Sequence, residues 1–346
     1  MELSGLLENP DWYLYALESS GATFTPMSRE HYRRSIFLDR RLAAQSDQRK
    51  LIAYDKLAEA LGDKLHQPSP VSYIFTMAHC GSTLLSRALD VESGTLVCRE
   101  PLPLRQLAVE YVTQNAAQSG SGDWRARLEL VTSLLGRGYQ AEAPTIVKAN
   151  VPVNFILDEI LSTSATPLSV FVYFPLERYL LAVLRTPKHR QWVKNVCEAL
   201  LPAIKRHAPV DANTPLAQLA AGLWLSQVRS YSEAMTKYAK TVSLDGEEFL
   251  NTPKPVLRKA FSYFKASVSE EQQNSILNGE LFSHHSKMPN VPFDNAKRLE
   301  IREGIRKIIQ PELDQAREWV EAVAKDNPLP EKLSRPLHGD APALLA

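Results

Sequence analysis

The chain has 346 residues, with 40 Lys and Arg against 39 Asp and Glu, 44% hydrophobic residues and three Cys. The net charge of +1 gives no support to general binding of nucleic acids or anionic membranes. No apolar run exceeds six residues (179–184), and no basic segment followed by an apolar one opens the chain, so we expect neither a membrane span nor secretion. The cysteines are odd in number and far apart, which is typical of a reduced, cytoplasmic protein.

The N-terminal region, residues 1–66, is predicted to be a helical extension. Tyr13, Leu14 and Leu17 have the spacing of one apolar helix face, and a second apolar stripe follows between residues 51 and 61. The turn-forming run QPSP at 67–70 ends this region. We expect residues 67–327 to form the main domain, and residues 328–346, with four prolines, to form an extended or loose tail.

The main domain contains short apolar runs rich in β-branched and aromatic residues, at 71–77, 95–98, 145–148, 168–174 and 241–244. Amphipathic helical patterns lie between them, for example at 104–112, 153–161 and 193–201. This alternation predicts an α/β fold with three αβα layers and a central parallel sheet of about five strands. After residue 244 the pattern is mostly helical, with an interruption near 282–293.

The segment YIFTMAHCGSTLLSRAL at 73–89 is the most informative motif. A β run ends at Met77, small polar residues make a turn, and a helix follows. Gly81 lets the backbone approach a ligand, and the free N–H groups of the first helical turn can bind an anion together with the Ser82 and Thr83 hydroxyls. The alternative is an ordinary strand–helix turn with a capping Ser or Thr. The Walker sequence GxxxxGK[ST] is absent, so the usual parts of magnesium-dependent nucleotide hydrolysis are missing.

The pair His79-Cys80 followed by Arg87 resembles the HCx5R signature of cysteine phosphatases. Here six residues separate Cys80 from Arg87, and one extra residue rotates a helical side chain by about 100° away from the anion. A phosphatase with Cys80 as its nucleophile is therefore a lower-ranked hypothesis.

The same segment resembles the 5′-phosphosulfate loop, hxP[KR]SG[ST][ST]LLxR, of the sulfotransferases that use 3′-phosphoadenosine 5′-phosphosulfate (PAPS). Residues 81–85 match directly, whereas Ala78, His79 and Cys80 replace the Pro, the basic residue and the Ser. REPL (99–102), IVKANVP (146–152), FVYFPLERYLLAVL (171–184) and SLDGEEFLNTP (243–253) resemble later elements of the family in the same order. The chain thus resembles a divergent, bacterial-type member with the P-loop sulfotransferase fold.

This resemblance implies an enzyme that transfers a sulfuryl group from PAPS to a hydroxyl or amine of a small-molecule acceptor, leaving PAP and using no metal. It implies three catalytic residues: Glu100 as the base, Lys148 as a stabiliser of developing charge, and His79. The cofactor-binding residues that it implies are His79, Cys80, Gly81, Ser82, Thr83, Leu84, Arg178 and Arg185. We expect no nucleic-acid or membrane partner, and the sequence does not indicate an oligomeric state.

Several positions depart from the family pattern. Asn150 replaces the His base of the cytosolic members, while Tyr173 and Leu181 replace the Arg and Ser that hold the 3′-phosphate. Together with His79 these changes predict a site poorer in fixed cations than that of the relatives. They support a second hypothesis, a sulfotransferase-fold protein without PAPS activity that binds another phosphorylated ligand or a protein partner.

Ordinary structural roles compete with the catalytic ones. Lys148 could simply close a strand, and Glu100 could be an acidic residue near the start of a helix. Arg178 and Arg185 could compensate for the missing 3′-phosphate contacts. For the basic run at 185–190, however, a solvated connection between helices is the favoured interpretation. His284, His285 and Lys287 are interpreted as a surface loop rather than a metal site.

Overall fold

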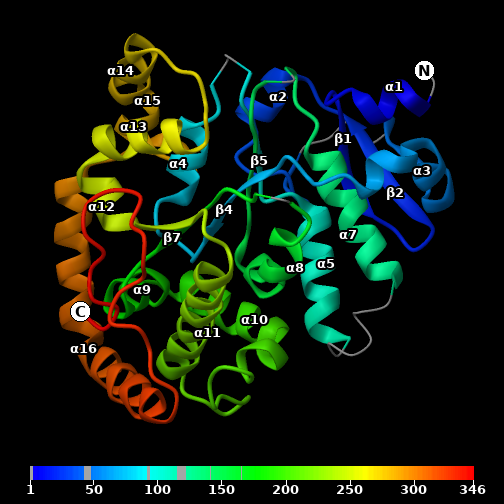
Figure 1. The fold of residues 1–346 in the computed structure, drawn as a ribbon. Helices are drawn as coiled ribbons and strands as arrows, with labels where there is room; N and C mark the ends of the chain where they lie inside the picture. Colours follow the sequence, from blue (N-terminus) through cyan, green and yellow to red (C-terminus); the bar gives the residue numbers. More distant parts are fainter. Residues whose placement is uncertain (1–2, 43–47, 92–93, 115–121, 141, 165) are drawn as a thin grey trace.

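The central sheet has the predicted architecture. The computed structural model describes residues 3–42, 48–91, 94–114, 122–140, 142–164 and 166–346. Within them, five parallel strands lie in the order β5-β6-β4-β7-β8. Their bounds are β4 (Ser72–Thr76), β5 (Leu96–Arg99), β6 (Thr145–Lys148), β7 (Ser169–Tyr173) and β8 (Thr241–Asp245). Each strand falls on a predicted β run, and the expected three-layer α/β fold is confirmed (Figure 1).

Helices cover both faces of this sheet, which explains why β4 and β7 are buried at every position. Helix α4 packs against β4, β5 and β6, while the 3-10 helix η3 contacts β4 from the other side. The helices between the strands are α4 (Ser82–Ala88), α5 (Leu102–Thr113), α7 (Gly122–Leu135), η3 (Val151–Ile156), α8 (Leu157–Leu161), α9 (Leu176–Val183), α10 (Pro187–Ile204) and α11 (Leu216–Lys237).

Between β8 and the C-terminal tail the chain is mainly helical, with one short hairpin that accounts for the predicted interruption near 282–293. Its last helix, α16, is kinked at Ile309, just before Pro311, and its second part packs against α11. The elements here are α12 (Gly246–Asn251), α13 (Pro253–Tyr263), α14 (Glu270–Asn278), α15 (Glu280–Ser283), β9 (His284–His285), β10 (Met288–Pro292) and α16 (Asn295–Asp326).

The N-terminal extension contains helices, as expected, but it is built around an antiparallel sheet that the sequence did not reveal. Its elements are α1 (Leu3–Glu8), β1 (Trp12–Leu17), β2 (Gly21–Pro26), α2 (Arg29–Arg34), β3 (Lys50–Ala53), α3 (Tyr54–Leu61) and the 3-10 helix η2 (Gly62–His66). The helix predicted from Tyr13, Leu14 and Leu17 is wrong, because these residues belong to β1. This strand is buried at five of its six positions and packs on α5, so it lacks the polar alternation of a half-exposed strand.

A buried network joins the extension to the edge of the main sheet at β5. The Leu38 N–H donates to the Arg99 carbonyl at 2.7 Å, and the Leu102 N–H donates to the Leu38 carbonyl at 3.2 Å. The Arg99 guanidinium is fully buried and lies 2.7 Å from the carboxylate of Asp90, which also pairs with Arg29 at 2.6 Å. The segment around Leu38 is therefore fixed beside Glu100, the residue that follows β5.

The C-terminal tail is extended, but it is not loose. The Ser243 N–H of β8 donates to the Arg335 carbonyl at 3.0 Å, and the Leu337 N–H donates back to the Ser243 carbonyl at 2.7 Å. Leu333 and Leu344 are buried in the core. The tail thus continues the main sheet beyond β8. No helix in the described ranges has the length and hydrophobicity needed to cross a membrane.

Replacing Asp90 with Ala should lower the free energy of unfolding by about 3–5 kcal/mol, because it leaves the buried Arg99 guanidinium without its counter-charge. Urea denaturation measures this change. The matched control is Asp158→Ala, which breaks the exposed pair with Lys237 and should cost about 1 kcal/mol or less. An equal loss of unfolding free energy in the two variants would contradict a large contribution of the Asp90 network to stability.

Candidate functional site

The loop between β4 and α4 has a tightly constrained backbone. His79 and Gly81 both have positive φ values, 63° and 89°, a conformation that costs little for Gly and is uncommon for His. Gly246, at the turn between β8 and α12, packs directly beneath the loop. A Cβ atom on Gly246 would lie 2.2 Å from the Cys80 carbonyl oxygen. The loop is therefore held at the carboxyl end of β4 by contact with the end of β8.

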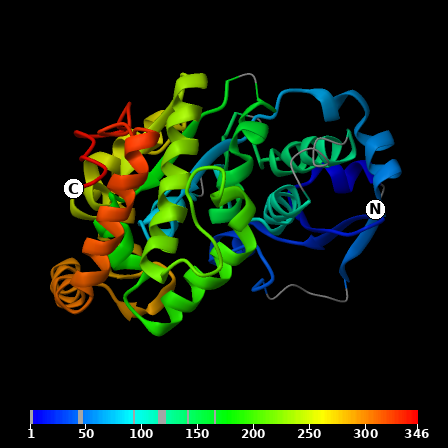
Figure 2. The same ribbon diagram turned by 90° about the horizontal axis from the view of Figure 1, so that it is seen from below.

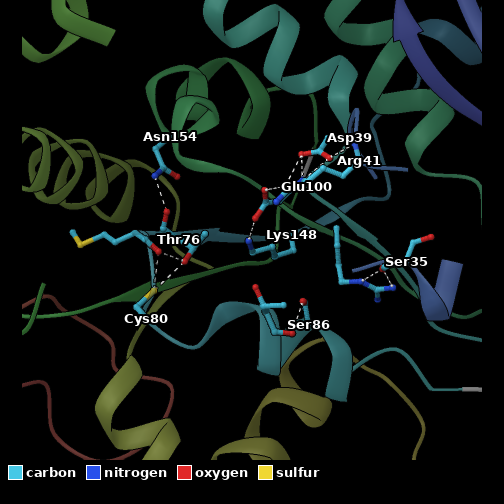
Figure 3. Close-up of polar contacts among 12 residues, drawn as sticks. Ser35, Asp39, Arg41, Thr76, Cys80, Ser86, Glu100, Lys148 and Asn154 are labelled. Carbon is cyan, nitrogen blue, oxygen red and sulfur yellow. Dashed lines mark hydrogen bonds and ion pairs between the residues drawn. The ribbon is translucent and has the colours of Figure 1, made fainter. Parts of the chain in front are cut away.

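Cys80 points into the protein and not toward the ligand side of the loop. Its Sγ lies 3.0 Å from Oγ1 of Thr76, and 3.0 and 3.2 Å from the carbonyl oxygens of Met77 and Val172 (Figure 3). Burial raises the pKa of the Cys80 thiol, which disfavours a nucleophilic thiolate. The phosphatase hypothesis is contradicted, and only the backbone of Cys80 can take part in ligand binding.

The next residues give the loop its polar groups. Ser82 and Thr83 are largely buried, yet their hydroxyl groups form no hydrogen bond with any other described residue. The first turn of a helix also leaves backbone N–H groups without helical acceptors. Leu84, in contrast, is 6% exposed and packs in the core, so its side chain is structural.

Glu100 and Lys148 meet at the ends of two neighbouring strands. Arg99 of β5 is paired in register with Lys148 of β6, so Glu100 comes immediately beyond that level. Lys148 is only 3% exposed. Its ammonium group donates a hydrogen bond to Oε1 of Glu100 (Figure 3). Glu100 has a φ of 56°, which orients it away from the regular path of β5. The structure thus brings together the predicted base and charge stabiliser as an ion pair.

Arg41 from the N-terminal extension completes this pair, although no sequence motif indicated it. Its Nη2 lies 3.4 Å from Oε2 of Glu100, and Asp39 holds the guanidinium through Nε at 2.8 Å and Nη2 at 2.5 Å. The same guanidinium stacks 3.8 Å from the centre of the Phe37 ring. Both Glu100 oxygens are therefore positioned by cations from different parts of the chain.

Further cations gather around the loop from the C-terminal half. The Phe37 ring centre is 5.7 Å from Nζ of Lys148 and 6.0 Å from Nζ of Lys287, in the β9–β10 hairpin. The His79 ring lies 4.6 Å from that of His189 on α10, and Arg185 Nη2 lies 2.8 Å from His189 Nε2. The run 185–190 is thus more than a solvated connection, because its His189 contacts the loop.

Burial and mutual repulsion lower the pKa values in this cluster. Burial, with the charges of Lys287 and Arg185, lowers the pKa of His79 to about 2, so His79 is neutral in the free protein. Burial and the neighbouring Arg185 lower the pKa of His189 to about 4. Burial and the nearby Lys148 ammonium lower the pKa of Lys287 to about 8. Each of these three side chains is therefore harder to protonate in the free protein than it would be in water.

The structure adds Arg41 and Lys287 to the cations that the sequence placed at the site. Within the described ranges, neither Lys287 nor Arg185 has a carboxylate within salt-bridge distance, and Glu100 is already shared by Lys148 and Arg41. Bringing an anion to the loop would relieve the repulsion between these cations. The arrangement of charges therefore favours the approach of an anion with several negative charges.

The predicted 3′-phosphate region is different. Arg178 on α9 pairs with Asp245 at 3.1 Å, so its charge is neutralised at the β8 side of the loop. The Leu181 side chain is buried in the core, and the buried Tyr173 hydroxyl has no hydrogen-bond partner among the described residues. Asn150 comes immediately before η3, and its Oδ1 is likewise buried without a partner among the described residues.

Comparison with protein-family models gives no match, and neither does comparison with curated protein sequences. Among solved structures, the chain is similar to the sulfotransferase domain of the curacin biosynthetic pathway, with 11% identity and a TM-score of 0.42 over 75% of this chain and 97% of that one. A Mycobacterium avium sulfotransferase has 14% identity and a TM-score of 0.43 over 75% and 80% of the two chains. Retinol dehydratase in complex with retinol and PAP has 12% identity and a TM-score of 0.36 over 80% and 87%. Similarity at this level supports no statement about activity.

Sulfate should bind to the cation cluster with an affinity that decreases as the pH rises through about 8. Lys287 loses its proton in the free protein in that range, whereas a bound anion favours the protonated form, so binding requires proton uptake. Calorimetry from neutral to alkaline pH measures this dependence.

Lys287→Met should weaken sulfate binding at neutral pH and flatten this part of the profile. Lys325→Met removes an exposed lysine at the end of α16 and is the control. It should leave the sulfate affinity and its pH dependence unchanged. A wild-type profile that is flat over the same range would remove Lys287 from the site.

Proposed function

We propose that the chain is a sulfotransferase that moves a sulfuryl group from PAPS to a hydroxyl or amine of a small molecule. The observation that carries this proposal is the position of the Glu100–Lys148 pair beside a loop surrounded by cations that lack carboxylate partners. A base and an anion site at adjacent strand ends are the two parts that sulfuryl transfer requires.

The residues present fit a ligand with several negative charges. The Ser82 and Thr83 hydroxyls and the backbone of the loop would hold the oxygens of the phosphosulfate group. Lys148 and Lys287 would neutralise its charge, and Arg185 would face the 3′-phosphate. When bound, PAPS supplies an activated sulfuryl group, and transfer of this group requires no metal where fixed cations stabilise the leaving phosphate.

Glu100 and Lys148 have complementary roles in this proposal. The Glu100 carboxylate would accept the proton that the acceptor loses as it attacks sulfur, while Lys148 would shift its hydrogen bond toward the departing phosphate oxygen. Arg41 keeps Oε2 of Glu100 oriented while Lys148 moves, because Asp39 holds the guanidinium independently. Arg41 is therefore a positioning residue in this scheme.

A second candidate is a protein of the same fold that binds another phosphorylated ligand without sulfuryl transfer. It is favoured by the absence of cations at Tyr173 and Leu181 and by the pairing of Arg178 with Asp245. These features remove the expected contacts to a 3′-phosphate but leave the 5′ anion site intact. The two candidates therefore differ in whether the 3′-phosphate contributes to affinity.

Calorimetry with PAP and with AMP distinguishes the two candidates. If PAPS is the donor, PAP should bind at least about tenfold more tightly than AMP, which lacks the 3′-phosphate, since one added charge contact of this kind contributes about 1.4 kcal/mol or more. Arg185→Met should reduce this preference, and Arg258→Met, on the exposed face of α13, is the control. Equal affinities for PAP and AMP would favour the second candidate, and no binding of PAP would exclude the first.

Glu100→Gln should lower turnover by about 10²- to 10⁴-fold and leave the affinity for PAP nearly unchanged, because a base acts on the acceptor. Turnover is measured as release of PAP from PAPS in the presence of a panel of small phenols, alcohols and amines. Glu321→Gln, an exposed carboxylate on α16, is the matched control. If Glu100→Gln lowered PAP affinity and turnover to the same extent, Glu100 would have a structural role.

A further inference from the structure

The first part of α16 has an exposed apolar surface. Ile301 and Ile308 are 54% and 79% exposed, and Met288 and Val291, in the preceding hairpin, are 52% and 44% exposed. Of the large apolar side chains that are exposed in the described ranges, only Leu51 lies elsewhere. Ile301 and Ile308 lie about two turns apart on one side of α16, and grouped exposed apolar side chains are more informative than isolated ones.

The isoleucines are not needed to hold α16 in place. Another face of the helix anchors it, because Arg298 and Arg302 pair with Glu247 at 2.7 and 2.9 Å. One turn further on, Arg306 pairs with Glu177 at 2.5 Å. Figures 1 and 2 show α16 at the outer side of the molecule, opposite the N-terminal extension. Ile301 and Ile308 are therefore free to contact another molecule.

Gly304 lies between the two isoleucines on the same side of the helix. A Cβ atom at this position would have no heavy atom within 4 Å, so packing inside the chain gives no reason for a glycine in a helix interior. The spacing Lys297, Ile301, Gly304, Ile308 alternates steps of four, three and four residues, which is the spacing of a helix–helix seam. A glycine in such a seam leaves room for a large side chain from a facing helix.

The charges beside the seam indicate which helix faces it. Glu300 and Lys307 each precede one of the isoleucines, both are exposed, and neither forms an ion pair within the described part of the chain. In an antiparallel pair of α16 helices, Glu300 of one copy would face Lys307 of the other, and the contact would occur twice. A parallel pair would instead place Glu300 opposite Ile305.

We propose that this surface, formed by Ile301, Gly304 and Ile308 with Glu300 and Lys307, binds the same surface of a second copy of the chain. The contact is self-complementary, as a two-fold dimer requires, and it closes without leading to a filament. Ile301 of each copy sits over Gly304 of the other. The net charge of +1 opposes this association only weakly. The dimer does not depend on the proposed enzymatic activity.

Sedimentation equilibrium of the full chain over a range of protein concentrations tests the proposal. The wild type should form a concentration-dependent dimer, and Ile308→Glu should weaken it by at least about tenfold, because a buried unpaired carboxylate replaces an apolar contact. Leu51→Glu, on β3 of the N-terminal sheet, is a control with a similarly exposed apolar side chain and should leave the dimer unchanged. A monomer at every concentration, or a dimer that survives Ile308→Glu, would overturn the proposal.

Charge reversal tests the antiparallel arrangement. Lys307→Glu should weaken the dimer by bringing two carboxylates together at each end, and the double variant Glu300→Lys/Lys307→Glu should restore it. Circular dichroism of each variant shows that the fold is intact, so that a loss of association reports on the interface. A double variant as weak as Lys307→Glu alone would overturn the antiparallel pairing.

Discussion

The parallel register of β5, β6 and β4 is the constraint on which the candidate site depends. Lys148 is level with Arg99 on one side and with Ile74 on the other, so the residues just beyond these three strands emerge at one edge. A shift of one residue in β6 would turn the Lys148 side chain to the opposite face of the sheet and separate it from Glu100. The same register places the loop after β4 beside the ion pair. Segments far apart in the sequence thus form one site.

The central sheet could be predicted from the sequence because strands covered on both faces are short, apolar and rich in β-branched residues. The sequence placed Glu100 and Lys148 at the ends of predicted strands, but it did not predict the ion pair between them. Strand β1 was missed because its nearly continuous burial mimics the apolar spacing of a helix. Arg41 and His189 carry no local pattern, and their positions depend on how the extension and α10 pack.

The balance of charges along the chain hides a strong local separation. Glu247 and Glu177 beside α16 hold arginines of that helix, as Glu247 does with Arg298 and Arg302. Around the loop the balance is reversed, because Lys148, Lys287 and Arg185 converge on a region where Glu100 is already shared. An overall charge of +1 is therefore compatible with a site whose cations repel one another. It is the position of each carboxylate, and not their number, that gives the region around the loop its excess of positive charge.

The C-terminal tail has a consequence for solubility as well as for the fold. Strand β8 is an edge strand of the main sheet. The backbone N–H and carbonyl of Ser243 on its outer side are hydrogen-bonded to the Arg335 carbonyl and the Leu337 N–H. At the opposite edge of the sheet, the Leu38 N–H bonds to the Arg99 carbonyl of β5 in a comparable way. A sheet edge with unpaired backbone groups can add a strand from another molecule, which is a common route to aggregation. The prolines of the tail suit this task, because a proline-rich segment can pair with β8 while offering few donors to a further strand.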